Sequence, residues 1–171
     1  FFHQAHLSAV RGYPPLAFAE AFSLMAVTTI VFGLVAAELI DRFGAVRILP
    51  FFLLPLIAAT LTAALVEPVW GIYIFMVLFG VSYGLTSTMF GALWPEVYGV
   101  RNLGAIRAVI VSAMVFATAL GPGITGALID RGVDLPQQLF WMAGWSALAT
   151  AGLAWAARRV RVRQAGEQAP A

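Results

Sequence analysis

The sequence predicts an all-α membrane protein with five transmembrane helices. Of its 171 residues, 61% are hydrophobic and only 11% are charged, whereas a soluble domain carries about 25% charged residues. The apolar residues are concentrated in runs of about 20, the length at which a helix spans the hydrocarbon core of a bilayer. Short segments rich in charge, Pro and Gly separate these runs, so the order of the helices can be followed along the chain.

The five predicted spans are joined by short connections. Residues 1–14 are too polar and too short to span, and we expect them to form an outer loop and the end of a truncated helix. Residues 15–163 form the predicted transmembrane domain, and residues 164–171 are expected to be a disordered tail. The spans cover about residues 15–40, 48–66, 70–93, 104–129 and 137–157.

Prolines and small residues inside the spans predict bends and close packing. Pro50 and Pro55 predict a bend in the second span, because proline removes a backbone donor. In the third and fourth spans, small residues permit close helix approach and a proline favours a hinge. These expected packing or hinge positions are Gly80, Gly84, Gly91, Gly121, Pro122 and Gly126.

The arginines predict how the chain is oriented, since all ten basic residues are Arg. Five spans place the chain ends on opposite sides. Eight arginines fall on the side of the C-terminus, and only Arg11 and Arg131 fall on the other. Because cytoplasmic loops are enriched in positive charge, the C-terminus is predicted to be cytoplasmic. Anionic lipids are the expected partners of the last four arginines: Arg158, Arg159, Arg161 and Arg163.

The tetrapeptide Leu-Ile-Asp-Arg occurs twice, at residues 39–42 and again at 128–131. Each copy closes a predicted span, and the number of spans between them places the two copies on opposite membrane faces. Similarity of this kind is what an inverted-topology repeat leaves in a sequence. Coincidence is the alternative, because Asp is common at helix ends for reasons of turn chemistry.

The charged segment that contains the first copy resembles the signature loop of the major facilitator superfamily. That loop has the pattern Asp-Arg-x-Gly-x-x-Arg and joins the second and third helices of each six-helix half. Here the pattern is met by Asp41, Arg42, Gly44 and Arg47, and Ala37 stands where the family usually has Gly. Residues 95–104 resemble the family's connection between the tenth and eleventh helices, and residues 121–130 resemble the end of the eleventh.

This resemblance implies most of the C-terminal half of a transporter, from the end of the seventh helix through the twelfth. The chain also begins Phe-Phe-His-Gln without Met, so we expect N-terminal helices of the same protein as its partner. The implied function is secondary active transport of a small solute by alternating access, in a bacterial inner membrane. The alternative is a membrane scaffold or assembly subunit that does not transport.

The resemblance also implies that the charged loop is a conformational latch, that is, a contact that holds one face of the transporter closed. Arg107, near the start of the fourth span, is the expected ion-pair partner of Asp41. The alternative is that these charges only end helices and anchor the topology, because exposed ion pairs contribute about 0–1 kcal/mol. The expected latch residues are Glu38, Asp41, Arg42, Gly44, Arg47 and Arg107.

Three further residues are candidates for ion coupling or for a substrate cavity. Glu20 lies inside the first span, where a carboxylate suggests proton coupling or a cation contact; a hydrated outer vestibule is the alternative. Tyr83 and Ser87 share one helical face in the third span and could line a cavity. Alternatively, such hydroxyls bond to backbone carbonyls or to a neighbouring helix.

The sequence predicts neither an enzyme nor a cofactor-binding protein. There is no cysteine, and His3 and His6 lack a nearby carboxylate that would complete a metal site. We find no Gly-rich phosphate loop and no nucleophile, base and acid in a plausible order. The arginine-rich tail has no folded polar domain beside it, so nucleic acid is not an expected partner.

Overall fold

A computed structural model of the chain describes residues 3–14 and 16–167, and within that part every regular element is an α-helix. Four helices are long and apolar enough to cross a membrane, namely α2, α5, α6 and most of α7, and α4 is a shorter apolar helix. This confirms an all-α membrane protein. The helices are α1 (Gln4–Arg11), α2 (Ala17–Phe43), α3 (Ala45–Ile48), α4 (Leu54–Leu65), α5 (Trp70–Tyr98), α6 (Leu103–Asp130) and α7 (Leu135–Glu167).

The second predicted span is not one continuous helix. Residues 49–53 form turns between α3 and α4, and the 12 residues of α4 extend about 18 Å at about 1.5 Å per residue. The two prolines explain the interruption. Pro50 cannot donate to the carbonyl of Val46, and Pro55 lies in the first turn of α4, where its missing N–H costs nothing. The expected bend is therefore a complete break.

Other helix ends also differ from the expected bounds. Residues 164–167, expected to be disordered, continue α7, while residues 168–171 lie outside the described part. The N-terminal segment, expected to be an outer loop and the end of a truncated helix, contains a helix of eight residues, α1. Helices α2 and α5 run past their predicted ends to glycines with positive φ, Gly44 at 83° and Gly99 at 70°, a conformation that glycine adopts readily.

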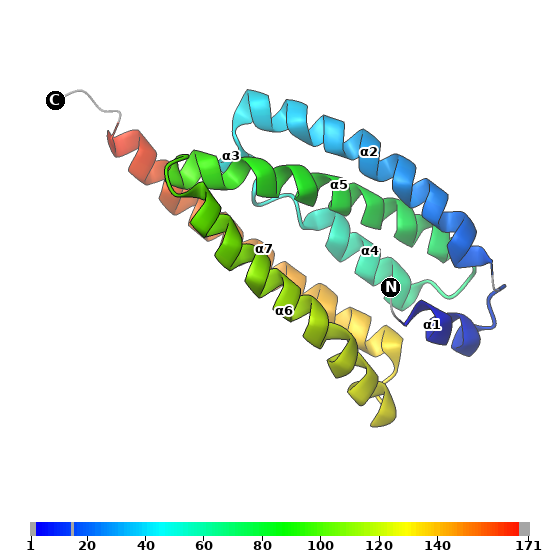
Figure 1. Cartoon of the computed structure of the whole chain (residues 1–171). Helices are drawn as coiled ribbons and strands as arrows, with labels where there is room; N and C mark the ends of the chain where they lie inside the picture. Colours follow the sequence, from blue (N-terminus) through cyan, green and yellow to red (C-terminus); the bar gives the residue numbers. More distant parts are fainter. Residues whose placement is uncertain (1–2, 15, 168–171) are drawn as a thin grey trace.

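The connections between the helices lie at two opposite ends of the bundle (Figure 1). The α2–α3 and α5–α6 connections and the C-terminal end of α7 lie at one end, and α1 with the α4–α5 and α6–α7 connections lies at the other. The two Leu-Ile-Asp-Arg segments close α2 and α6 and therefore lie at opposite ends (Figure 1). We call the end that holds Gly44 and Gly99 the arginine-rich end.

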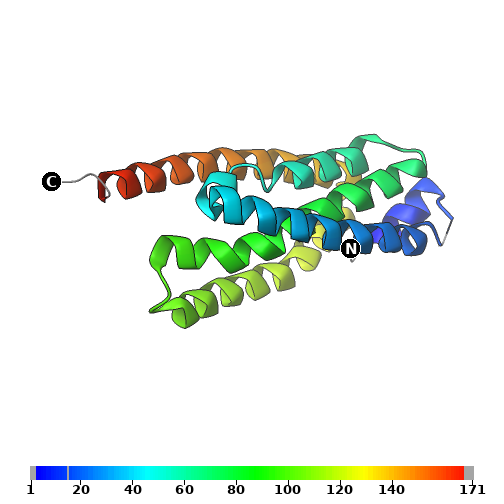
Figure 2. The ribbon, with the colours of Figure 1, turned by 90° about the horizontal axis from the view of Figure 1, so that it is seen from above.

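Packing is uneven across the bundle. The most extensive contact is between α2 and α5, followed by the contacts of α4 with α7 and α5. Helix α6 diverges from α5 after their connection (Figure 1), and seen from above it lies on the opposite side of the bundle from α7 (Figure 2). None of its residues is buried. The part of the chain that the structure describes therefore has a packed body and one outlying helix, α6.

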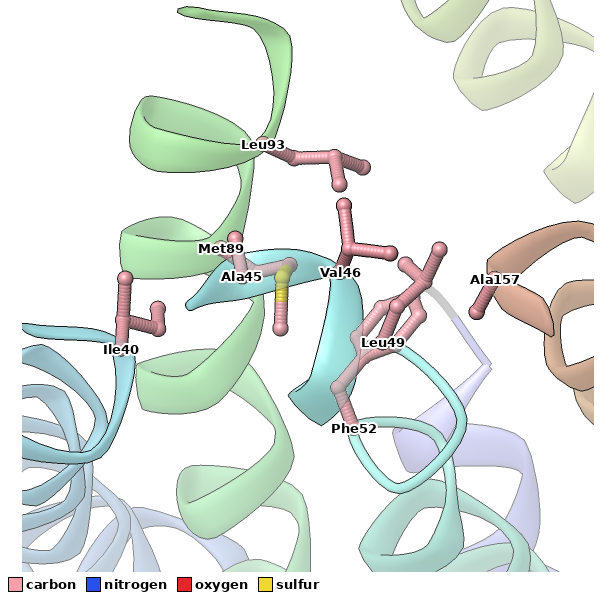
Figure 3. Packing of buried hydrophobic residues seen from close by; sticks show 8 residues of the cluster. All are labelled: Ile40, Ala45, Val46, Leu49, Phe52, Met89, Leu93 and Ala157. Carbon is pink, nitrogen blue, oxygen red and sulfur yellow. The ribbon is translucent and has the colours of Figure 1, made fainter. Parts of the chain in front are cut away.

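Two clusters of buried side chains hold the packed body together. At the arginine-rich end, Val46 and Leu49 of the α3 region lie against Met89 of α5 and Ala157 of α7 (Figure 3). At the other end, Leu7, Tyr13 and Phe18 pack with Ile72 and Met76. The short α3 is thus a core element that joins α2, α5 and α7.

Arg11 fixes the N-terminal segment to the end of α4. Its guanidinium donates to the carbonyl of Val66 at 2.9 Å and to that of Ala64 at 3.2 Å. The hydroxyl of Tyr13 donates to the carbonyl of Glu67. The last carbonyls of a helix have no partner within the helix, so these donors satisfy the C-terminal end of α4 and explain why residues 3–14 are ordered.

Candidate functional site

The α2–α5 interface is a close helix contact built on glycines. A Cβ atom at Gly84 would lie 2.5 Å from the carbonyl oxygen of Thr29 and 2.8 Å from the nitrogen of Gly33. A Cβ atom at Gly80 would lie 2.6 Å from the carbonyl oxygen of Met25. All three distances are too short for a real Cβ atom, so only glycine fits at these two positions, as expected for small residues at a membrane helix interface.

The other expected packing positions are open in the described part of the chain. A Cβ atom at Gly91 or Gly121 would meet nothing within 4 Å, and at Gly126 it would meet only the imidazole of His3, at 3.7 Å. Pro122 lies inside α6. The structure therefore brings Gly80 and Gly84 into a close contact between two helices. Among the described residues it shows no such contact at Gly91, Gly121 or Gly126.

The charged loop turns at Gly44, whose φ of 83° and ψ of 148° end α2 and start α3. Within α2, one turn earlier, the Nε of Arg42 donates to the carboxylate of Glu38 at 2.5 Å. Both side chains are more than half exposed, and an exposed pair four residues apart on a helix stabilises it by only about 0.3–0.5 kcal/mol. This ion pair lies within α2 and contributes little to stability.

Glu96, near the end of α5, holds the loop from the other side. Its carboxylate accepts hydrogen bonds from the backbone N–H of Ala45 at 2.5 Å and of Val46 at 3.2 Å. These N–H groups begin α3 and have no acceptor within that helix, and a carboxylate there also interacts favourably with the positive end of the backbone dipoles. The sequence analysis did not identify this role of Glu96.

The structure does not pair Asp41 with Arg107. Asp41 and Arg47 are exposed, and neither makes an ion pair or hydrogen bond with another residue that the structure describes. Arg107 instead donates to the carbonyl of Gly91 at 3.2 Å. Pro95 explains this contact, because it has no N–H to donate to the carbonyl four residues before it, which is that of Gly91. Arg107 of α6 supplies the missing donor.

A cavity of about 500 Å³ lies between α5 and α6. It brings together Tyr83 and Ser87, the two candidate cavity residues, with the aromatic side chains of α5 and the guanidinium of Arg107. Ser87 lines the cavity, and its hydroxyl donates to the carbonyl of Gly84 in its own helix, at 3.0 Å. The lining residues are Tyr83, Thr86, Ser87, Phe90, Gly91, Trp94, Arg107, Ile110, Val111 and Met114.

Glu20 lies apart from this cavity. It is an exposed residue in the first turn of α2, at the end of the helix far from Gly44, and it does not line the cavity. The hydroxyl of Tyr73 on α5 donates to its carboxylate at 2.9 Å. The candidate coupling residue and the candidate cavity residues therefore belong to different places in the fold.

Comparison with known proteins gives one match. The family model described as Major Facilitator Superfamily matches residues 2–171, which is all of the chain except its first residue. Neither the curated proteins nor the solved structures include a match to the chain. The matched range contains the charged loop, the glycine contact between α2 and α5, and the cavity between α5 and α6.

Proposed function

The chain belongs to the major facilitator superfamily, and from this premise we propose that it moves a small solute by secondary active transport. Members of this family are membrane transport proteins, so the chain is an integral membrane protein that takes part in membrane transport. The observation that carries the proposal is the family match over residues 2–171, together with four helices able to cross a membrane. The proposed mechanism is alternating access, in which two helical halves rock about a central binding site.

In this proposal the chain is most of the C-terminal half, and N-terminal helices of the same protein complete the transport path. The exposed surface of α6 supports this arrangement, since none of its residues is buried and its Gly121 and Gly123 have no neighbours within 4 Å of a Cβ position. Reading the gene upstream of Phe1 tests the proposal. Seven further apolar spans are expected, and a start codon immediately before Phe1 would contradict it.

The charged loop is proposed as a latch at the cytoplasmic face of a bacterial inner membrane. Glu96 holds the loop within this half, and Asp41 and Arg47 are exposed and available for a contact with the other half. Such a contact would break when the halves separate, so its strength biases the conformational equilibrium. The arginines at the end of α7 are proposed to bind anionic lipids on the same face.

Uptake into proteoliposomes made with the full-length protein tests both transport and the latch. A panel of radiolabelled solutes, each measured with and without a proton gradient, should reveal saturable uptake of at least one solute. Asp41→Asn should change the rate or the inward-to-outward ratio, whereas Asp134→Asn, at the opposite end of the helices, is the matched control. Equal kinetics in the Asp41 variant and the wild type would remove the latch, and no uptake of any solute would favour a scaffold.

A further inference from the structure

We propose that the cavity between α5 and α6 binds a small organic monoanion, a carboxylate with an apolar body, as the transported substrate. The inference rests on the proposed transport function and adds the chemical class of the solute. The volume of the cavity, about 500 Å³, lies within the range of about 300–1,000 Å³ typical of small-molecule sites. The charge, the hydrogen-bond donors and the apolar surface of the lining each restrict the ligand.

The charge of the lining selects an anion. Arg107 is the one charged residue among those that line the cavity, and no carboxylate lines it. Among the residues that the structure describes, Arg107 makes no ion pair, and its single hydrogen bond is to the carbonyl of Gly91. A guanidinium has five N–H donors, so most of them remain available. A cationic ligand would meet this positive charge with no opposite charge to offset it.

The free polar groups of the lining are mostly donors. The hydroxyl of Tyr83 and the indole N–H of Trp94 make no hydrogen bond to any other residue in the described part of the chain. The hydroxyls of Thr86 and Ser87 already donate to carbonyls of α5, at 2.7 and 3.0 Å, so only their neutral oxygens are left as acceptors. A ligand rich in acceptor oxygens satisfies this arrangement, and a carboxylate matches the planar fork of Arg107.

The remaining lining restricts the ligand to an organic monoanion. Phe90, Ile110, Val111 and Met114 give the cavity a largely apolar wall, which cannot replace the water around a hydrated inorganic anion such as phosphate. One arginine neutralises one negative charge. Gly91, the partner of Arg107, and Tyr83 are eight residues apart on α5, or about 12 Å along the helix, so a carboxylate at Arg107 leaves room for an apolar body that extends toward Tyr83.

Equilibrium binding of radiolabelled benzoate to the purified full-length protein tests the inference without a gradient. Benzamide, which has the same shape but no charge, and inorganic phosphate serve as competitors. We expect benzoate to bind and to be displaced by excess unlabelled benzoate but by neither competitor. Arg107→Gln should weaken binding about tenfold or more, the loss expected for a charge-assisted hydrogen bond, while Arg107→Lys should lose less. Arg101→Gln, an exposed arginine in the α5–α6 connection, should bind as the wild type does.

The following outcomes overturn the inference in whole or in part. It fails if benzoate does not bind, if benzamide competes as well as benzoate, or if Arg107→Gln binds as tightly as the wild type. The comparison of benzoate with benzamide uses the wild type alone, so it remains decisive should the arginine variants not fold. Saturable uptake of a neutral or cationic solute without benzoate binding would refute the anion site and leave transport intact. Binding that depends on Arg107, with no uptake of any solute, would refute transport and leave the anion site intact.

Discussion

Replacing Gly84 by alanine is expected to destabilise the protein, even though alanine is the better helix former. In an open helix interior the change stabilises by about 1 kcal/mol. At Gly84, however, the new Cβ atom would lie 2.5 Å from the carbonyl oxygen of Thr29 on α2. The obstacle is backbone and cannot rotate away. Helix α2 must therefore retreat by about 1 Å before the pair reaches the 3.4 Å of ordinary van der Waals contact.

That retreat affects the whole contact between α2 and α5. Overpacking of a tight contact costs about 1–3 kcal/mol. Two interhelical hydrogen bonds are also weakened, from Thr29 to the carbonyl of Gly80 at 3.3 Å and from Thr88 to that of Gly33 at 3.2 Å; such bonds average about 0.6 kcal/mol each in membrane proteins. After the gain in helix propensity is subtracted, the expected net destabilisation is about 1–3 kcal/mol.

Thermal unfolding of the purified protein in detergent, followed by circular dichroism, measures this effect. The matched control is Gly91→Ala in the same helix, where a Cβ atom meets nothing within 4 Å. The control should unfold at the wild-type temperature or above it, and Gly84→Ala should unfold several degrees below. If the two variants unfold at the same temperature, the glycine contact does not determine how α2 and α5 pack, and the reasoning is refuted.

Two further substitutions test the polar contacts. Glu96→Gln leaves one weak acceptor for the N–H groups of Ala45 and Val46, and a loss of about 1.4 kcal/mol there would speed amide exchange about tenfold. Hydrogen exchange followed by mass spectrometry measures this rate. Unchanged exchange in α3 would contradict the role of Glu96. Glu20→Gln should remove the pH dependence of uptake if Glu20 carries the coupling proton, whereas Tyr73→Phe, which removes only the hydrogen bond, should retain it. Uptake by the Glu20 variant that still follows the proton gradient would exclude that role.

The helical regions could be predicted because the bilayer imposes a simple rule on sequence. An apolar run of about 20 residues has few alternatives to a spanning helix, so four of the five predicted spans correspond to long helices. The second span differs because the length of an apolar run does not show where a backbone N–H donor is missing. Pro50 and Pro55 were recognised as causes of a bend, but two prolines five residues apart leave too few consecutive hydrogen bonds for one helix. The position of α1 against the end of α4 involves the contacts of Arg11 with the carbonyls of Val66 and Ala64, which no local pattern reveals.

The candidate site could be predicted only where spacing along one helix decides the outcome. Tyr83 and Ser87 line one cavity because residues four apart lie on the same helical face. The contact between Glu96 and α3 joins positions about 50 residues apart, and its acceptor binds backbone rather than a complementary charge, so charge counting could not detect it. The family resemblance led us to expect Arg107 as the partner of Asp41. However, Pro95 leaves the carbonyl of Gly91 without a donor, and Arg107 donates to that carbonyl.

Pro95 and Glu96 together make the last turn of α5 a link between the loop and the cavity. Pro95 frees the carbonyl of Gly91, which accepts from Arg107 of α6, and Glu96 accepts from the first N–H groups of α3. Neighbouring residues on a helix move together, so displacement of this turn changes the contact to the loop and the contact to the cavity arginine at the same time. Under the proposals above, a displacement of this turn on opening of the latch would also move the partner of the guanidinium at the anion site.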